Sequence, residues 1–309
     1  MRIVSLLPAA TEIVFALGLG DELVGRTHGC DYPPESAAVP VVTAEADAPA
    51  DGPQRGTGDR VRARLHGGLA LARLDAAAFV AAAPDLVLTE DPCDLCAAAH
   101  GRMTEALRGL AGEVSVVGLD ASSIEGILNT VSTVGAMADA EDEAVGLVEI
   151  LRERLGVIEN RVLERRLQGV APRRVVCLEW LDPPFAAGRW VPEQVRRAGG
   201  WELLGRERER PAETTWEAVR EVDPEQLLLM PAGFDAAATR AQWARTPKPA
   251  WFGSLRAVAE GEVYALDGAA YFGRPGPRTI EGIGLLAEIL DPDGFVDQAP
   301  PGGWIPLAV

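Results

Sequence analysis

The chain has 309 residues, about twice the length of a usual domain, so its length predicts two domains. Its residues are 48% hydrophobic and 24% charged, which is ample material for a folded core. A formal net charge of −17 argues against nucleic acid, and against an anionic membrane surface, as a main partner.

Strands and helices are expected to alternate through the first half of the chain. A strand over 2–7 passes directly into a helix that Pro8 opens. Further strands are expected over 22–25, 39–42, 84–88 and 114–117, and helices over 72–82, 100–110 and 123–137. Residues 45–68 are rich in Ala, Asp, Pro, Gly and Arg without periodicity, which predicts a long loop.

The segment 140–168 predicts one long helix near the middle of the chain. Its apolar residues recur at spacings of three, four and seven: Val145, Val148, Leu151, Leu155, Ile158, Val162 and Leu163. About 28 helical residues would span roughly 40 Å, too long for a crossover helix in one small sheet. Periodicity alone allows a coiled coil, a surface helix or a connector between two lobes.

Strand–helix alternation restarts after Gln168, which favours the connector. Strands are expected over 173–179, 226–230 and 262–266, and helices over 193–198, 215–221, 235–245 and 279–290. The predicted domains are therefore a first lobe over 1–138, a connecting helix over 139–169 and a second lobe over 170–309. Ligands of such sheets gather beyond the carboxyl ends of the strands, where aromatic and charged residues fall in both halves.

Four segments in chain order carry a family resemblance. The first is Ile3-Val4-Ser5-Leu6-Leu7-Pro8-Ala9-Ala10-Thr11-Glu12, followed by Cys30-Asp31-Tyr32-Pro33-Pro34, and the second is Pro84-Asp85-Leu86-Val87-Leu88. The third is Asp182-Pro183-Pro184-Phe185, and the fourth is Tyr271-Phe272 with Arg274 and Pro277-Arg278. On these segments the chain resembles the helical-backbone class of ABC-transporter substrate-binding proteins, and within it the cobalamin-binding branch.

The resemblance implies an α/β fold: two three-layer α/β lobes joined by one long helix, with a ligand cleft between the lobes. The implied function is capture, without chemistry, of a cobalamin-like corrinoid or related metal chelate, for an ABC importer or as a cytoplasmic relative. The implied ligand-binding residues are Tyr32 on the first lobe and Asp182, Phe185, Trp190, Tyr271, Phe272 and Arg274 on the second. Alternatively, these aromatic residues belong to the lobe core. Asp75 and Glu217 match the carboxylates through which the family docks to arginines of its permease.

Three cysteines of the first half suggest a second kind of site. Cys93 and Cys96 form a C-x₂-C pair ahead of His100, and Cys30 follows His28, a donor set that suits zinc or iron. A disulfide, inert buried thiols or direct ligation of a corrinoid cobalt are the alternatives. These cysteines support a second candidate function, a cytoplasmic metal- or redox-handling protein on the same fold. Cys177, inside an apolar strand, is expected in the core.

The chain start and the motif content bear on location and chemistry. No secretory signal and no apolar run of membrane-spanning length is found, so the sequence as written predicts a cytoplasmic protein. If an export signal was removed, a periplasmic or cell-surface location is expected instead. No catalytic residues are predicted, because the chain contains no phosphate-binding loop and no G-x-S-x-G nucleophile turn.

Overall fold

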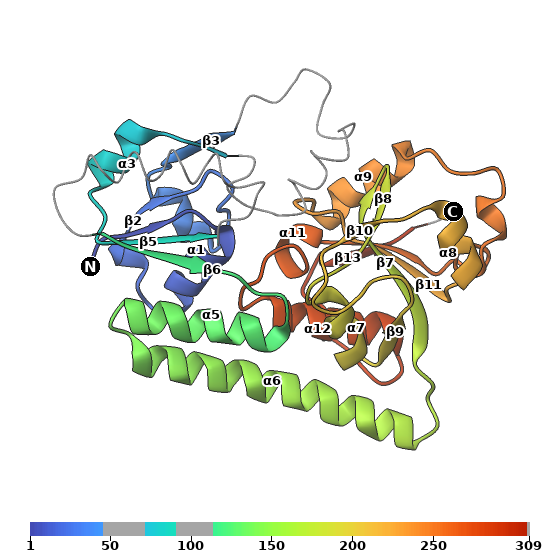
Figure 1. Ribbon diagram of the computed structural model, residues 1–309. Helices are drawn as coiled ribbons and strands as arrows, with labels where there is room; N and C mark the ends of the chain where they lie inside the picture. The colour runs from blue at the N-terminus through green and yellow to red at the C-terminus, as the bar shows by residue number, and fades with distance from the viewer. Residues whose placement is uncertain (46–71, 91–113, 308–309) are drawn as a thin grey trace. The chain divides into compact units, whose positions relative to one another are not determined.

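The computed structural model of the protein describes residues 1–45, 72–90 and 114–307 (Figure 1). These residues form two compact units. The first unit contains the described residues up to Ala121 together with Glu125–Ile150, and the second contains Ser122–Ile124 and the chain from Leu151 onwards. Both are α/β, and one long helix runs from the first into the second, so the predicted fold class is confirmed.

A four-stranded parallel sheet forms the centre of the first unit. Its order is β2-β1-β5-β6, with β1 at Ile3–Ser5, β2 at Leu23–Arg26, β5 at Leu86–Glu90 and β6 at Ser115–Leu119. A separate antiparallel pair joins β3 (Thr43–Glu45) to β4 (Ala72–Leu74). The helices are α1 (Pro8–Ala16), η1 (Gly20–Glu22), η2 (Pro34–Ala38), α3 (Ala76–Ala82) and α5 (Ile124–Met137).

Two expected elements of this unit were wrong in detail. The helix expected over 72–82 begins only at Ala76, because residues 72–74 form β4 and Asp75 caps the helix. The strand expected over 39–42 is reduced to a single bridge between Arg26 and Val41. The helix expected over 100–110 and most of the loop expected over 45–68 lie outside the described residues.

Helices pack on both faces of the first sheet. Val4, Leu6 and Val87 share one apolar cluster with Phe79 of α3. Ser5, whose side chain points to the opposite face, accepts a hydrogen bond at 2.9 Å from the Thr11 hydroxyl on α1. This layering agrees with the predicted three-layer lobe.

The long helix is α6, Glu141–Leu167, within a residue of the expected range. Its buried stripe consists of Ala144, Val148, Leu151, Leu155, Ile158 and Val162. Val145 and Leu163 were expected on this stripe, but they are 58% and 56% exposed. At 100° per residue both fall well to one side of the stripe's centre. Residues up to Ile150 belong to the first unit and those from Leu151 to the second.

The second unit has a larger, mixed sheet. Its main path is β10-β8-β7-β11-β12-β13, and β9 pairs with β7. The strands are β7 (Arg173–Leu181), β8 (Pro184–Ala186), β9 (Gly200–Glu202), β10 (Ala212–Glu213), β11 (Gln226–Leu229), β12 (Val263–Leu266) and β13 (Trp304–Pro306). β7, β9, β11 and β12 are parallel, whereas β8, β10 and β13 pair antiparallel.

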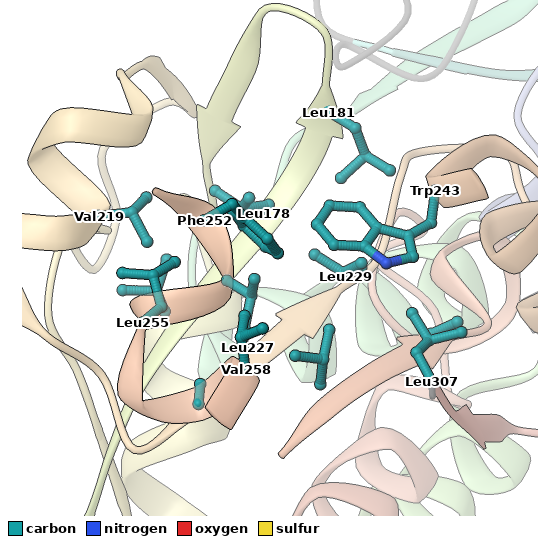
Figure 2. Packing of buried hydrophobic residues seen from close by; sticks show 14 residues of the cluster. Leu178, Leu181, Val219, Leu227, Leu229, Trp243, Phe252, Leu255, Val258 and Leu307 are labelled. Carbon is teal, nitrogen blue, oxygen red and sulfur yellow. The ribbon is translucent and has the colours of Figure 1, made fainter. Parts of the chain in front are cut away.

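Helices cover both faces of this sheet as well. They are α7 (Val191–Arg197), α8 (Trp216–Val222), α9 (Ala236–Arg245), η4 (Phe252–Ser254), α10 (Arg256–Ala259), α11 (Gly268–Tyr271) and α12 (Thr279–Leu290). Figure 2 shows one face, where strand residues such as Leu178, Leu227 and Leu229 pack against Trp243 and Phe252. On the opposite face, the Gln226 amide donates to the Ile289 carbonyl oxygen of α12. Cys177 is fully buried there, so its predicted place in the core is confirmed.

Of the helices in the described part of the chain, none combines the length and the apolar composition that a membrane crossing needs. α6 is long enough, but charged residues line most of its exposed side.

Candidate functional site

The carboxyl edge of the second sheet gathers most of the predicted ligand-binding residues. β7, β11 and β12 run parallel, so the segments that follow them emerge at the same edge. Asp182 directly follows β7, and Tyr271 ends α11, the short helix after β12. Phe185 lies in β8, which folds back beside β7. The order of elements therefore delivers these side chains to one end of the sheet.

A chain of contacts joins the two outer segments of this edge. The Trp180 indole N–H donates to the Asp182 carbonyl oxygen at 3.1 Å. The Trp180 ring meets Phe234 edge-to-face, with centroids 5.8 Å apart. The Ala269 N–H of α11 in turn donates to the Phe234 carbonyl oxygen at 3.0 Å. Asp182 and α11 are therefore held by one packed aromatic pair.

All four predicted aromatic ligand contacts of the second unit are buried. Phe185, Trp190, Tyr271 and Phe272 are 1%, 2%, 8% and 1% exposed. The Trp190 indole N–H donates to the Phe272 carbonyl oxygen at 2.9 Å, and the Phe272 ring meets Tyr271 edge-to-face at 6.5 Å. This burial agrees with the alternative interpretation that these rings are lobe core. Their contact with a ligand stays a prediction, as does that of the half-buried Asp182 and Arg274.

Two arginines that were not predicted as ligand residues lie beside these rings. The Arg189 guanidinium is 5.8 Å from the centre of the Trp190 ring, and the Arg278 guanidinium is 5.9 Å from that of Tyr271. Both distances fit a cation–π contact. Together with Arg274 they place three guanidinium groups at this edge, among the carboxyl groups of Asp182, Asp235 and Asp267. The Pro277-Arg278 pair of the fourth matching segment was the sequence signal for one of them.

Sequence reasoning also missed two buried carboxyl groups behind this edge. Glu179 in β7 accepts a hydrogen bond from the Gly188 N–H at 3.0 Å, and Glu202 in β9 accepts from the N–H groups of Cys177, Leu204 and Gly205. Burial raises the pKa of each carboxyl group to about 7, against the lowering effect of these hydrogen bonds. The signal available was a glutamate inside an apolar strand.

The first unit holds the remaining predicted ligand residue, Tyr32. It follows β2 at the carboxyl edge of the parallel sheet, and its side chain is 42% exposed. Nearby, the Cys30 sulfur lies 2.9 Å from the Thr11 hydroxyl, and His28 Nδ1 lies 2.9 Å from the Thr43 hydroxyl. This end of the sheet is therefore lined by polar side chains.

The predicted metal site falls mostly on residues that the structure does not describe. Cys93, Cys96 and His100 lie outside the described residues, so only Cys30 and His28 have a position. Among the described residues there is no group of three or more His, Cys, Asp or Glu side chains that could hold a metal ion. The zinc or iron hypothesis thus gains no support from the described part of the chain.

The two predicted docking carboxylates occupy equivalent local positions. Asp75 is the N-cap of α3 and accepts from the N–H groups of Ala77 and Ala78 at 3.1 and 3.0 Å. Glu217 lies in the first turn of α8, which Thr215 caps instead. Both side chains are exposed, Asp75 in the first unit and Glu217 in the second.

Comparison with known proteins identifies the family. A model of the periplasmic binding protein family matches residues 3–270, most of the chain. The chain belongs to the periplasmic binding protein family. The resemblance found on the four sequence segments is thereby confirmed at the level of the family.

Individual relatives agree with this assignment. The chain is 26% identical over 304 residues to the Bacillus subtilis protein YvrC, described as an uncharacterized ABC transporter substrate-binding lipoprotein, with 95% of this chain and 81% of YvrC covered. It is 22% identical over 245 residues to the vitamin B12-binding protein of Pectobacterium atrosepticum, covering 78% and 76% of the two chains. A periplasmic heme-binding protein of Pseudomonas aeruginosa shares the fold with a TM-score of 0.68 at 20% identity, covering 94% of this chain and 92% of that one.

Proposed function

We propose that the protein is the substrate-binding component of an ABC importer and that its ligand is a cobalamin-like corrinoid or a related metal chelate. YvrC, named as a substrate-binding lipoprotein, supports the first part, and the vitamin B12-binding relative supports the second. YvrC also supports an exported location over the cytoplasmic one expected from the sequence as written. The metal- or redox-handling alternative has no comparable relative in its favour.

The observation that carries the proposal is the carboxyl edge of the second sheet. It combines aromatic rings with the guanidinium groups of Arg189, Arg274 and Arg278 and the carboxylate of Asp182. A corrin is broad, flat and mostly apolar, with amide groups around its rim. The rings at this edge are themselves buried, and the charged hydrogen-bonding groups beside them suit the rim of such a ligand.

A ligand titration distinguishes corrinoids from haem. Haem is the comparison because its carboxylates would pair with the same arginines. Purified protein is titrated with cyanocobalamin and, separately, with haemin, and the absorption bands and the heat of binding are recorded. We expect cyanocobalamin to bind with a Kd well below 100 μM, and therefore with a binding free energy more favourable than about −5.5 kcal/mol, the value at 100 μM. Binding of haemin alone would identify haem as the ligand in place of a corrinoid, and binding of neither at 100 μM would refute both of these ligands.

A pair of matched variants tests whether the proposed surface is the binding surface. Arg274→Met removes a charge from the edge, and we expect the Kd to rise about tenfold, or 1.4 kcal/mol. Arg240→Met removes the same charge from the exposed side of α9 and serves as the control. Equal affinities of the two variants would contradict the assignment of the surface.

We also propose that Asp75 and Glu217 dock the protein to its permease. Both carboxylates are exposed at the start of a short helix, Asp75 as the N-cap of α3 and Glu217 in the first turn of α8. The proposal rests on the family resemblance of these two positions, and the Asp75 variants described in the Discussion test its first-unit half.

A further inference from the structure

The loop that carries Arg274 and Arg278 is fixed by side chains of another element. This loop, Tyr271–Thr279, connects α11 to α12. Trp190 and Gln194 of α7 donate three hydrogen bonds to its main chain: the indole N–H to the Phe272 carbonyl oxygen, and the Gln194 amide to those of Tyr271 and Thr279. The distances are 2.9, 3.1 and 2.8 Å.

The spacing of these two donors explains why they act together. Trp190 is the N-cap of α7 and Gln194 lies four residues later, so both side chains project from the same side of the helix. Their side chains are 2% and 0% exposed. Because the Gln194 nitrogen faces two carbonyl oxygens, only one orientation of its amide group satisfies the contacts.

The Gln194 amide is tightly packed against α12. A Cβ atom added at Gly282 of α12 would come within 2.8 Å of the Gln194 amide nitrogen and 2.9 Å of the Tyr271 carbonyl oxygen. The amide therefore fills the space between α12 and the end of α11. Losing its N–H groups would leave two buried carbonyl oxygens without these donors, which is costly in a water-excluded site.

Two hydrogen bonds shape the loop locally. Gly273 N–H donates to the Gly268 carbonyl oxygen at 2.7 Å, and the Thr279 hydroxyl donates to that of Arg274 at 3.1 Å. Bonds from an element far away in the sequence give a longer-range anchor. The donors from α7 supply that longer-range anchor, 77 to 85 residues away in sequence.

We infer that Gln194 and Trp190 are positioning residues that hold the Tyr271–Thr279 loop in one conformation and so set the affinity of the binding surface, an inference that rests on the proposed function. They act through the loop that presents Arg274 and Arg278 and need not touch the ligand. Sequence reasoning did not single out Gln194, and it named Trp190 as a ligand contact and not as an anchor of the loop.

The chain offers a matched control in Gln226. It is 2% exposed, and its amide also donates to two acceptors, the Ile289 carbonyl oxygen at 3.1 Å and the Glu262 carboxylate at 2.9 Å. It begins β11, at the end of the strand opposite the binding edge. Gln194→Met and Gln226→Met therefore remove the same kind of group from the same unit.

Hydrogen exchange of the ligand-free protein tests the anchoring directly. In Gln194→Met we expect the amides of the 271–279 loop to exchange at least tenfold faster, with no such change in Gln226→Met. Trp190→Phe removes a single N–H while keeping an aromatic ring, and we expect a smaller acceleration in the same loop; it serves as the test should Gln194→Met fail to fold. Unchanged exchange of the loop in both α7 variants would overturn the inference.

Ligand titration then tests the link to affinity. We expect the Kd for cyanocobalamin, or for haemin if that is the ligand, to rise at least tenfold in Gln194→Met and less than twofold in Gln226→Met. Wild-type affinity in a Gln194→Met protein with accelerated exchange would overturn the positioning role. If the wild-type protein binds neither probe, the corrinoid and haem forms of the proposed function fail, and hydrogen exchange still decides whether α7 holds the loop.

Discussion

Glu179 allows a direct test of how burial affects the stability of the second unit. Its carboxyl group is 7% exposed, and burial raises its pKa from an ordinary 4.5 to about 7. A raised pKa means that the folded state holds the proton more tightly than the unfolded state. The resulting stability is fully present below pH 4.5 and is lost as the pH rises through 7.

The expected magnitude follows from the two pKa values. Between pH 6 and pH 8 the unfolded carboxyl group is already ionised, while the folded one gives up its proton. Linkage then predicts a fall of about 1 kcal/mol in the free energy of unfolding over this interval for Glu179. Glu202, whose pKa is also raised to about 7 by burial, adds a similar fall.

Replacing Glu179 by Gln removes one of these two contributions. The Gln side chain keeps an oxygen that can accept from the Gly188 N–H, but it does not titrate. We therefore expect Glu179→Gln to halve the loss of stability between pH 6 and pH 8. Glu221→Gln, which removes the same charge from the exposed side of α8, is the control and should behave as wild type.

Tryptophan fluorescence is the assay because it reports the second unit alone. All seven tryptophans follow residue 179 in the chain. Urea unfolding followed by this signal at pH 6 and pH 8 gives the free energies for the three proteins. A wild-type protein with equal stability at the two pH values, or a Glu179→Gln variant that falls as steeply as wild type, would refute the reasoning.

Three further predictions concern the first unit and α6. Gly135→Ala should lower the stability of the first unit by about 1–3 kcal/mol, because the new Cβ would collide with that of Ala144 and lie 2.9 Å from the Ala140 carbonyl oxygen. At Gly156 a new Cβ would meet no described atom within 4 Å beyond the backbone of its own helix, so Gly156→Ala should raise stability by up to about 1 kcal/mol, and thermal unfolding measures both changes. Asp75→Ala should lower the free energy of unfolding by about 1 kcal/mol, because it removes the cap of α3. Asp75→Ser keeps a capping side chain but removes the charge. Weaker permease binding by the Ser variant in a pull-down assay would therefore report docking separately from folding.

The elements that sequence reasoning predicted well are those whose signal is local. α6 and α12 were predicted within a residue of their observed bounds, because each has a dense apolar repeat along one continuous segment. The parallel strands other than β9 were predicted for the same reason, as short apolar runs between turns. Local pattern therefore accounted for the two α/β lobes and for the helix between them.

The elements that were missed depend on partners far away in the sequence. β8 and β9 have three residues each and exist because they pair with β7. β4 was read as helix, since its Ala-rich sequence favours helix and its partner β3 is more than twenty residues earlier. The pairing of β8 with β7 also explains why Phe185 is buried although prolines precede it, and no local pattern carried that information.

The boundary between the two units falls inside α6, and this limits how the protein can be divided. Ala144 and Val148 are buried with the first unit, while Leu155, Ile158 and Val162 are buried with the second. A fragment cut between Ile150 and Leu151 would end in the middle of a hydrogen-bonded helix. A fragment extended to include all of α6 would expose to water the half of the α6 apolar stripe that packs on the other unit. Each lobe produced alone is therefore expected to aggregate or to bind the other lobe. Co-expression of two overlapping fragments is therefore a better way to study the lobes separately than isolation of either one.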